Sequence, residues 1–231
     1  FLKDFVNLSG DNNPLHIDKT YSRRLLYGKP VIHGVFTLLK ILDFWVANNK
    51  KRLNFNTLKV RFVKPVFNND SLDLNISEEN DNVKIQVYIK SVLSLSISFS
   101  FSLENDLNIN KGYKNETPDL IIPKEISIDQ VLDLSLNLNL YLHEELFEKH
   151  FPNLFKNASL SLMSVILAST RAVGVYCPGS NSLYSELNIK KSDSFNPKFD
   201  LNIPKIYKSL NLAKMDFKAS FYSGSIKAFV R

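Results

Sequence analysis

The sequence contains a single cysteine, Cys177, among its 231 residues. One thiol cannot form an internal disulfide, and no second cysteine stands at the spacing of a zinc or redox motif. The four histidines, at positions 16, 33, 143 and 150, form no close ligand cluster along the chain. We therefore expect neither a disulfide framework nor a bound metal ion.

Long hydrophobic runs are also absent. A transmembrane helix needs about 20 consecutive apolar residues, whereas the longest apolar stretch, residues 35–46, is interrupted by Thr37, Lys40 and Asp43. We therefore expect no membrane span. No secretory signal is recognisable in the first residues, so a cytoplasmic location is the default expectation. Because the sequence begins at Phe1 and not at a methionine, we also expect its natural N-terminus to be missing.

Acidic residues are in the minority, since 29 Lys and Arg residues against 23 Asp and Glu residues give a net charge of +6. Part of the positive charge is concentrated in Lys50–Arg52, Lys59, Arg61 and Lys64. A basic surface of this kind could meet the phosphates of a cofactor, an acidic carrier protein or nucleic acid. No recognisable nucleic-acid module accompanies it. We expect no nucleic-acid partner and interpret the charge as a solvated face.

The first 34 residues carry the pattern that is richest in chemistry. Residues 9–16, Ser-Gly-Asp-Asn-Asn-Pro-Leu-His, place a carboxylate and an imidazole five positions apart across a loop. Residues 27–34, Tyr-Gly-Lys-Pro-Val-Ile-His-Gly, end in a glycine at the start of a long apolar segment. A carboxylate and an imidazole can transfer protons, and the N–H at a helix N-terminus can stabilise an oxyanion. These groups are the minimum set for adding or removing water next to a carbonyl.

The apolar periodicity predicts a central helix followed by strands. Residues 34–48 are apolar nearly all the way round, which is typical of a helix in the middle of a core. Alternating apolar and polar residues then predict four strands, an antiparallel sheet with one buried face. Short helices are predicted at residues 1–7 and 19–26. The predicted strands cover residues 58–62, 72–76, 83–89 and 93–101.

The same order recurs after a polar linker at residues 104–125. A helix is predicted at residues 160–173, and strands at 183–189, 215–221 and 226–230. An offset of 124 positions sets Gly34 on Ala158, and it sets Asp11 and His16 on Ser135 and Leu140. The pattern therefore predicts an α+β protein of two tandem units. Residues 1–110 carry the active site, and residues 111–231 form a degenerate copy that pairs with the first sheet to sheet and walls the substrate site.

Residues 5–18 and 27–34 resemble the MaoC-type dehydratase family, which includes the (R)-specific enoyl-CoA hydratases. The family pattern is roughly F-x-x-x-S-G-D-x-N-P-x-H, followed by F-G-x-P-I-x-H-G. The resemblance implies the hotdog fold, a curved antiparallel sheet wrapped around a central helix, and hence a double-hotdog chain. It implies that Asp11 and His16 are the catalytic pair and that the backbone N–H of Gly34 is the oxyanion donor.

Three further residues of the two segments are expected at the substrate site. Asn13 and His33 match the family pattern, and we expect them to order the loop rather than to transfer protons. Tyr27 stands where the family usually has Phe, and we expect it to form a wall of the pocket.

The activity that the resemblance implies is that of a hydro-lyase in fatty acid metabolism. It is the reversible syn addition of water to a trans-2-enoyl thioester, which gives an (R)-3-hydroxyacyl thioester. No cofactor is implied beyond the CoA or carrier protein that bears the acyl group. Acyl carrier protein is a candidate partner, and an exposed sheet edge or face makes a homodimer a reasonable expectation. Two alternatives stay open: a thioesterase on the same fold, and a non-catalytic acyl-thioester-binding or partner subunit.

Two features of the second half have competing interpretations. Cys177 lies in a segment rich in Pro and Gly, which favours a turn over a reactive thiol. His143 and His150 stand among glutamates, which we interpret as a solvated helix face rather than an acid–base site.

Overall fold

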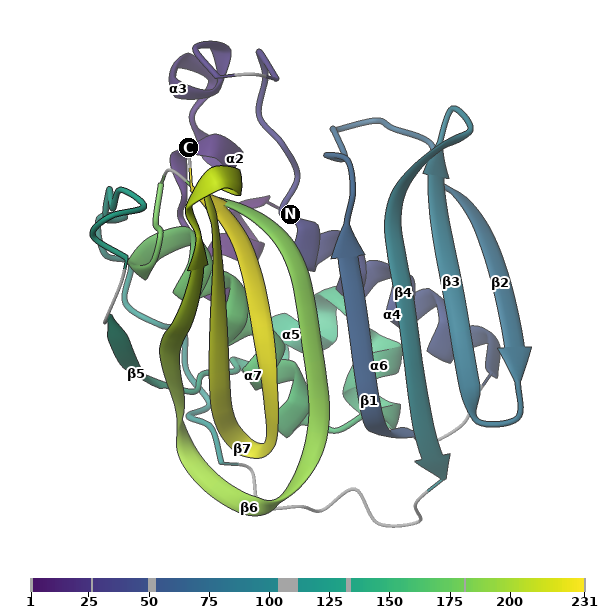
Figure 1. Cartoon of the computed structure of the whole chain (residues 1–231). Coiled ribbons are helices and arrows are strands. Elements are labelled where there is room, and N and C mark those ends of the chain that lie inside the picture. The colour runs from purple at the N-terminus through teal and green to yellow at the C-terminus, as the bar shows by residue number, and fades with distance from the viewer. Residues whose placement is uncertain are drawn as a thin grey trace.

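The computed structural model describes residues 2–25, 27–49, 53–103, 112–131, 134–180 and 182–230. The basic run Lys50–Arg52 and the predicted boundary between residues 110 and 111 lie outside these residues. Within them, the strands form one curved antiparallel sheet in the order β2-β3-β4-β1-β6-β5, with β7 paired to β6, and helices α4 to α7 lie on one face of it (Figure 1). The class is α+β, as the sequence predicts.

The elements have the following bounds. The helices are α1 (Leu2–Ser9), α2 (Pro14–Ile17), α3 (Lys19–Arg23), α4 (Gly34–Asn49), α5 (Glu144–His150), α6 (Pro152–Asn157) and α7 (Leu160–Arg171), the last continued by a π-helical turn η1 (Ala172–Tyr176). The strands are β1 (Leu53–Phe62), β2 (Asp73–Glu79), β3 (Asn82–Ile89), β4 (Val92–Leu103), β5 (Ser135–Asn139), β6 (Ser182–Tyr207) and β7 (Leu212–Val230), with a 3-10 turn η2 (Lys208–Leu210) before the last. None of the helices described is long and apolar enough to cross a bilayer.

Helix α4 is the central helix that the sequence predicts, and it packs against the sheet of the first half. The expectation that it is buried on every side is wrong in one respect. Lys40, Phe44 and Asn48 form an exposed stripe, because residues four apart share one face of a helix. The strands β1 to β4 confirm the four predicted strands and extend them. In β4 the odd-numbered residues 95–101 are buried, and the serines between them occupy the other face.

Strand β7 corrects the sequence prediction of two strands at 215–221 and 226–230. It is one strand with an irregularity at Ser220, which has a positive φ of 51°. Before this point the buried residues are odd-numbered, as in Met215 and Phe217, and after it they are even-numbered, as in Ile226 and Ala228. Ala219 and Ser220 are both buried, and this one-residue change of phase exchanges the two faces of β7. The pairing with β6 is also irregular at this point, with the additional residues on β6. The change of phase therefore reflects an irregularity within one strand and not a chain break.

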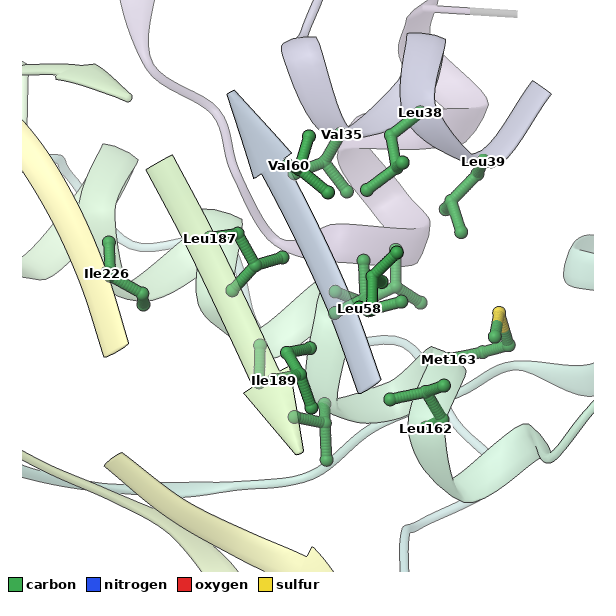
Figure 2. Close-up of a cluster of buried hydrophobic side chains, with 14 of the residues drawn as sticks. Val35, Leu38, Leu39, Leu58, Val60, Leu162, Met163, Leu187, Ile189 and Ile226 are labelled. Atoms are coloured by element: carbon green, nitrogen blue, oxygen red, sulfur yellow. The ribbon is translucent and has the colours of Figure 1, made fainter. Parts of the chain in front are cut away.

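The two halves of the chain share one sheet and one core. Residues 57–61 of β1 pair antiparallel with residues 186–190 of β6, so the sheet-to-sheet pairing predicted for the two halves is present. Figure 2 shows side chains of both strands between helices α4 and α7, in a single apolar cluster. Helix α7 begins at Leu160, close to the position that the offset from Gly34 predicts. The division into two tandem units stays a prediction.

A buried carboxylate also ties the helices of the two halves together. Asp43 of α4 is 9% exposed, and its Oδ1 accepts hydrogen bonds from the backbone N–H groups of Asn153 and Leu154, at 2.9 and 2.8 Å. Its Oδ2 accepts a third bond from the Asn153 side chain at 3.0 Å. The first backbone N–H groups of a helix have no acceptor within the helix. Asp43 thus caps α6 from another element.

Replacing Asp43 with Ala is expected to lower the free energy of unfolding by about 2 kcal/mol, since the N–H groups of Asn153 and Leu154 lose a charged acceptor. Asp43→Asn keeps one oxygen acceptor and should cost less. Urea denaturation measures both values, with the exposed Asp193→Ala as the matched control. An Asp43→Ala protein with the midpoint of the control would contradict this role.

Candidate active site

The loop after α1 is shaped by Gly10. Its φ is +74°, a conformation that side-chain-bearing residues rarely adopt. A Cβ at this position would lie 2.8 Å from carbons of both Arg171 and Pro118. Both the positive φ and the lack of space for a Cβ therefore require glycine here. This residue turns the chain so that Asp11 enters the interior.

Asn13 fixes the other side of the loop. Its side-chain oxygen accepts a hydrogen bond from the N–H of Leu15 at 3.0 Å, which caps helix α2, and Pro14 fills the first helical position. Its side-chain amide donates to the carbonyl of Gly179 at 3.2 Å. The residue thus anchors the loop to the second half of the chain, in keeping with the ordering role expected of it.

The carboxylate of Asp11 lies between the two halves and is 2% exposed. Its Oδ1 accepts from the N–H of Asn13 at 3.2 Å, and its Oδ2 accepts from the hydroxyl of Thr170 at 2.6 Å. A Cβ on Gly174 would lie 2.1 Å from Oδ1, so only glycine allows this approach. Burial raises the pKa of Asp11 above its usual value, while the charge of His16 and the Thr170 hydroxyl act against that rise.

His16 is oriented by a backbone carbonyl. Its Nδ1 lies 2.7 Å from the carbonyl oxygen of Val31. A carbonyl can only accept a hydrogen bond, so we assign the proton to Nδ1, and Nε2 is then the basic nitrogen of the neutral ring. This assignment gives His16 the tautomer that a general base requires.

His33 contacts both His16 and Asp11 from outside the cavity. Its ring stacks on that of His16 with centroids 3.7 Å apart, and its Nε2 donates to the carbonyl oxygen of Asp11 at 2.9 Å. The residue is fully buried, and Phe5 contacts its ring edge-on. Burial, and then the charge of His16, hold the pKa of His33 well below its usual value. His33 is therefore a neutral positioning group.

The ligand atoms of Asp11, His16 and His33 lie within 4.8 Å of one another, which raises the question of a metal ion. The two imidazole planes are only 26° apart, so their lone pairs run side by side. A metal ion needs lone pairs that converge on one point, at about 2.0–2.1 Å from each nitrogen. The geometry suits proton transfer better than metal coordination.

Gly34 is the first residue of α4 and faces the same cavity. The amides of the first helical turn lack intrahelical acceptors, and they carry the positive end of the helix dipole. A Cβ on Gly34 would lie 2.7 Å from the ring of Phe62, so a side chain has no room there. The structure thus places a helix-start amide beside the Asp11–His16 pair.

The cavity that these groups share has a volume of about 170 Å³. Five of the six residues predicted for the site line it: Asp11, Asn13, His16, Tyr27 and Gly34. His33 is the exception, since it lies behind His16. The second half supplies a further wall that includes Thr170, Val173, Gly174, Tyr184 and Phe229.

Sequence reasoning did not identify Thr170, Gly174 and Tyr184 as residues of the site. The sequence pattern placed Thr170 on the face of a predicted helix and Gly174 at the end of that helix, and it linked neither to the site. The available signal was the four-residue spacing of Thr170 and Gly174, because it places a hydroxyl and a glycine on one side of a helix. Tyr184 gave no signal, since its ring reaches the cavity only through the pairing of β6 with β1.

The remaining candidates of the second half do not form a site. Cys177 is fully buried, and burial raises the pKa of its thiol to about 12, which fits the turn and not a reactive thiol. The expectation of a solvated histidine face is wrong for His150, whose side chain is 13% exposed and 2.8 Å from Asp4. His143 caps helix α5 by accepting from the N–H of Leu146.

Comparison with known proteins finds a family that is similar to the first half of the chain. The family model of the MaoC like domain matches residues 2–96. Residues 2–96, called the MaoC-like domain from here on, are similar to that family. They contain Asp11, His16 and Gly34.

The MaoC-like domain is similar to parts of longer curated proteins. The peroxisomal multifunctional enzyme type 2 of Mus musculus is 35% identical over 80 residues, which are 33% of this chain and 11% of that protein. The peroxisomal hydratase-dehydrogenase-epimerase of Saccharomyces cerevisiae is 39% identical over 70 residues, 28% of this chain and 7% of that protein. The chain thus spans about a tenth of the length of the curated relatives that it matches.

The whole chain resembles a solved structure of a MaoC domain protein dehydratase from Chloroflexus aurantiacus. The TM-score is 0.61 at 9% identity, with 100% of this chain and 91% of that chain covered. At this identity the likeness concerns the fold alone. The fold is a hotdog fold, and the resemblance extends beyond the MaoC-like domain to the second half.

The buried neutral His33 should make stability depend on pH. Below about pH 6.5 the unfolded chain binds a proton at His33 that the folded chain does not, so the free energy of unfolding falls as the pH falls. The contribution approaches about 1.4 kcal/mol per pH unit. Urea denaturation between pH 7 and pH 5 should show a shallower decline for His33→Gln than for the wild type. Equal slopes for the two proteins would refute the assignment.

Proposed function

We propose that this chain is a hydro-lyase that adds water reversibly to a trans-2-enoyl thioester and gives the (R)-3-hydroxyacyl thioester. One observation carries the proposal: Asp11, His16 and the start of α4 at Gly34 line a single cavity. The yeast relative of the MaoC-like domain has a hydratase among the activities in its name. CoA or an acyl carrier protein would bear the acyl group.

In the hydration direction, Asp11 and His16 hold one water molecule against the β-carbon of the substrate. As the water oxygen bonds to this carbon, one of its protons passes to the pair, with Nε2 of His16 as the accepting atom. The pair then delivers one proton to the α-carbon on the same face. The product has gained one water molecule, and the enzyme returns to its starting protonation state.

Negative charge develops on the thioester oxygen when the β-carbon is attacked. An amide at the start of α4 can donate to this oxygen, and the helix dipole adds to the stabilisation. Such a donor acts chiefly in the transition state and is worth about 3–4 kcal/mol of barrier. The absence of a side chain at Gly34 leaves the approach to the N–H open.

The second half contributes to the same reaction by holding Asp11. The hydroxyl of Thr170 donates to Oδ2 of Asp11, and the other carboxylate oxygen, Oδ1, lies beside Gly174. A carboxylate fixed at both ends keeps one orientation toward the water. The degenerate half is therefore required for catalysis even though it lacks the motif itself.

We also propose a homodimer and retain the cytoplasm as the compartment, although both curated relatives above are named as peroxisomal proteins. Size-exclusion chromatography with light scattering tests the first of these proposals. Fluorescence microscopy of the tagged chain in its native cell tests the second.

The activity is tested by the loss of the conjugated thioester absorbance of crotonyl-CoA. Asp11→Asn and His16→Ala are each expected to lower kcat by about 10²–10⁴-fold, the usual contribution of a general acid or base. The exposed Asp193→Asn is the control and should keep wild-type rates.

Two results would overturn the assignment. A wild-type protein inert on short, long and carrier-bound enoyl thioesters would exclude a hydratase. Undiminished activity in both site variants would show that the reaction occurs elsewhere. Release of a free thiol from a saturated acyl-CoA would instead favour a thioesterase.

The role of Thr170 gives a separate expectation. Thr170→Val removes the hydroxyl at nearly constant volume and should lower kcat about tenfold, with a smaller effect on KM, because it loosens Asp11 without removing a substrate contact. Thr170→Ser keeps the hydroxyl and should restore most of the rate. Equal losses in the two variants would indicate a packing role only.

A further inference from the structure

The pairing of β1 with β6 ends beside the cavity. The last paired residues are Arg61 and Glu186, and the next residue of β1 is Phe62. Tyr184 of β6 lies beyond the same end of the ladder. The two rings lie side by side, with centroids 5.0 Å apart and planes tilted by 51°, and both line the cavity. An aromatic pair, one ring from each half of the chain, therefore stands where the strands cease to pair.

Both rings of the pair are held in place by other contacts. Phe62 lies against Gly34, as the distance to a Cβ at that position shows. The hydroxyl of Tyr184 donates to the hydroxyl of Ser169 on α7 at 3.0 Å. Burial raises the pKa of this Tyr184 hydroxyl, so the residue is a neutral donor. The pair is thus held by contacts within the fold and forms part of the cavity wall.

The position of the Phe62–Tyr184 pair indicates a contact with the acyl chain of the substrate. Phe62 contacts the residue whose amide would receive the thioester oxygen. The Tyr184 hydroxyl donates to Ser169, and the next residue of α7, Thr170, binds the carboxylate of Asp11. In the proposed function, the acyl chain would therefore pass from the carbonyl at the Phe62 end to the carbons beyond the β-carbon at the Tyr184 end.

The size of the cavity sets the length of chain that fits. A volume of about 170 Å³ is close to that of a cavity of about 150 Å³ that holds one benzene molecule. The reacting unit of an enoyl thioester already has four carbons. In the proposed function, this unit would fill most of the cavity while the two rings are in place.

Resting on the proposed function, we propose that the Phe62–Tyr184 pair closes the acyl end of the cavity and restricts the enzyme to short enoyl thioesters of about four to six carbons. Truncation of either ring extends the cavity. Because each ring comes from a different half, chain length is selected at the junction of the two halves.

The test compares kcat/KM for crotonyl-CoA, trans-2-hexenoyl-CoA and trans-2-decenoyl-CoA. For the wild type, the decenoyl value should be at least about tenfold below the crotonyl value. Tyr184→Ala and Phe62→Ala should each raise the ratio of decenoyl to crotonyl by about tenfold or more. Tyr184→Phe keeps the ring and should keep the wild-type ratio. Phe195→Ala, which truncates an exposed ring outside the cavity, is the control for the substitution itself.

The outcomes distinguish a failure of the chain-length limit from a failure of the proposed hydratase activity. A wild type that hydrates decenoyl-CoA as well as crotonyl-CoA overturns the chain-length limit and leaves the hydratase intact. A uniform loss on all three substrates in both Ala variants gives the rings a structural role and also overturns the limit. A wild type inert on every substrate refutes the hydratase instead. Calorimetry with butyryl-CoA and decanoyl-CoA then tests the limit alone, and equal affinities would overturn it.

Discussion

The contact between the Asp11 carboxylate and helix α7 is the constraint on which the rest of the site depends. A buried carboxylate is costly unless it is hydrogen-bonded, and here a threonine hydroxyl and a backbone N–H supply the bonds. The partner threonine belongs to the other half of the chain, so the site exists only when both halves are docked. The shared sheet, the common core and the Asp43 cap of α6 all maintain that docking.

The two halves of the chain contribute different groups to the site. The MaoC-like domain holds Asp11, His16 and the start of α4, whereas the second half supplies walls, a hydrogen bond and the space beside Gly174. The second half is therefore constrained by the site although it lacks the motif. Its helix must still present small and hydroxylic side chains to a carboxylate that lies about 160 residues away in sequence.

Much of this arrangement could be predicted from local sequence. The motif determined which side chains meet, because loop composition and the start of α4 bring Asp11, His16 and Gly34 together. Apolar alternation gave β1 to β4, since each strand has one buried face. Thr170 and Tyr184 could not be found in this way, because their places depend on how two halves pack. The single strand β7 was missed because the irregularity at Ser220 reverses the alternation of buried residues and imitates a chain break.

The irregularity at Ser220 has a consequence for the gene. Ala219 and Ser220 are both buried, so the inward side chains of β7 are odd-numbered before this point and even-numbered after it. Loss of the Ser220 codon would join the two parts into one regular alternation and would leave Ile226, Ala228 and Val230 inward. Loss of the Gly224 codon would instead turn these three side chains outward together and bring Lys227 into the core. A one-codon deletion in this strand should therefore be tolerated better at the irregularity than a few residues beyond it, so the place of a length change matters more than the change itself.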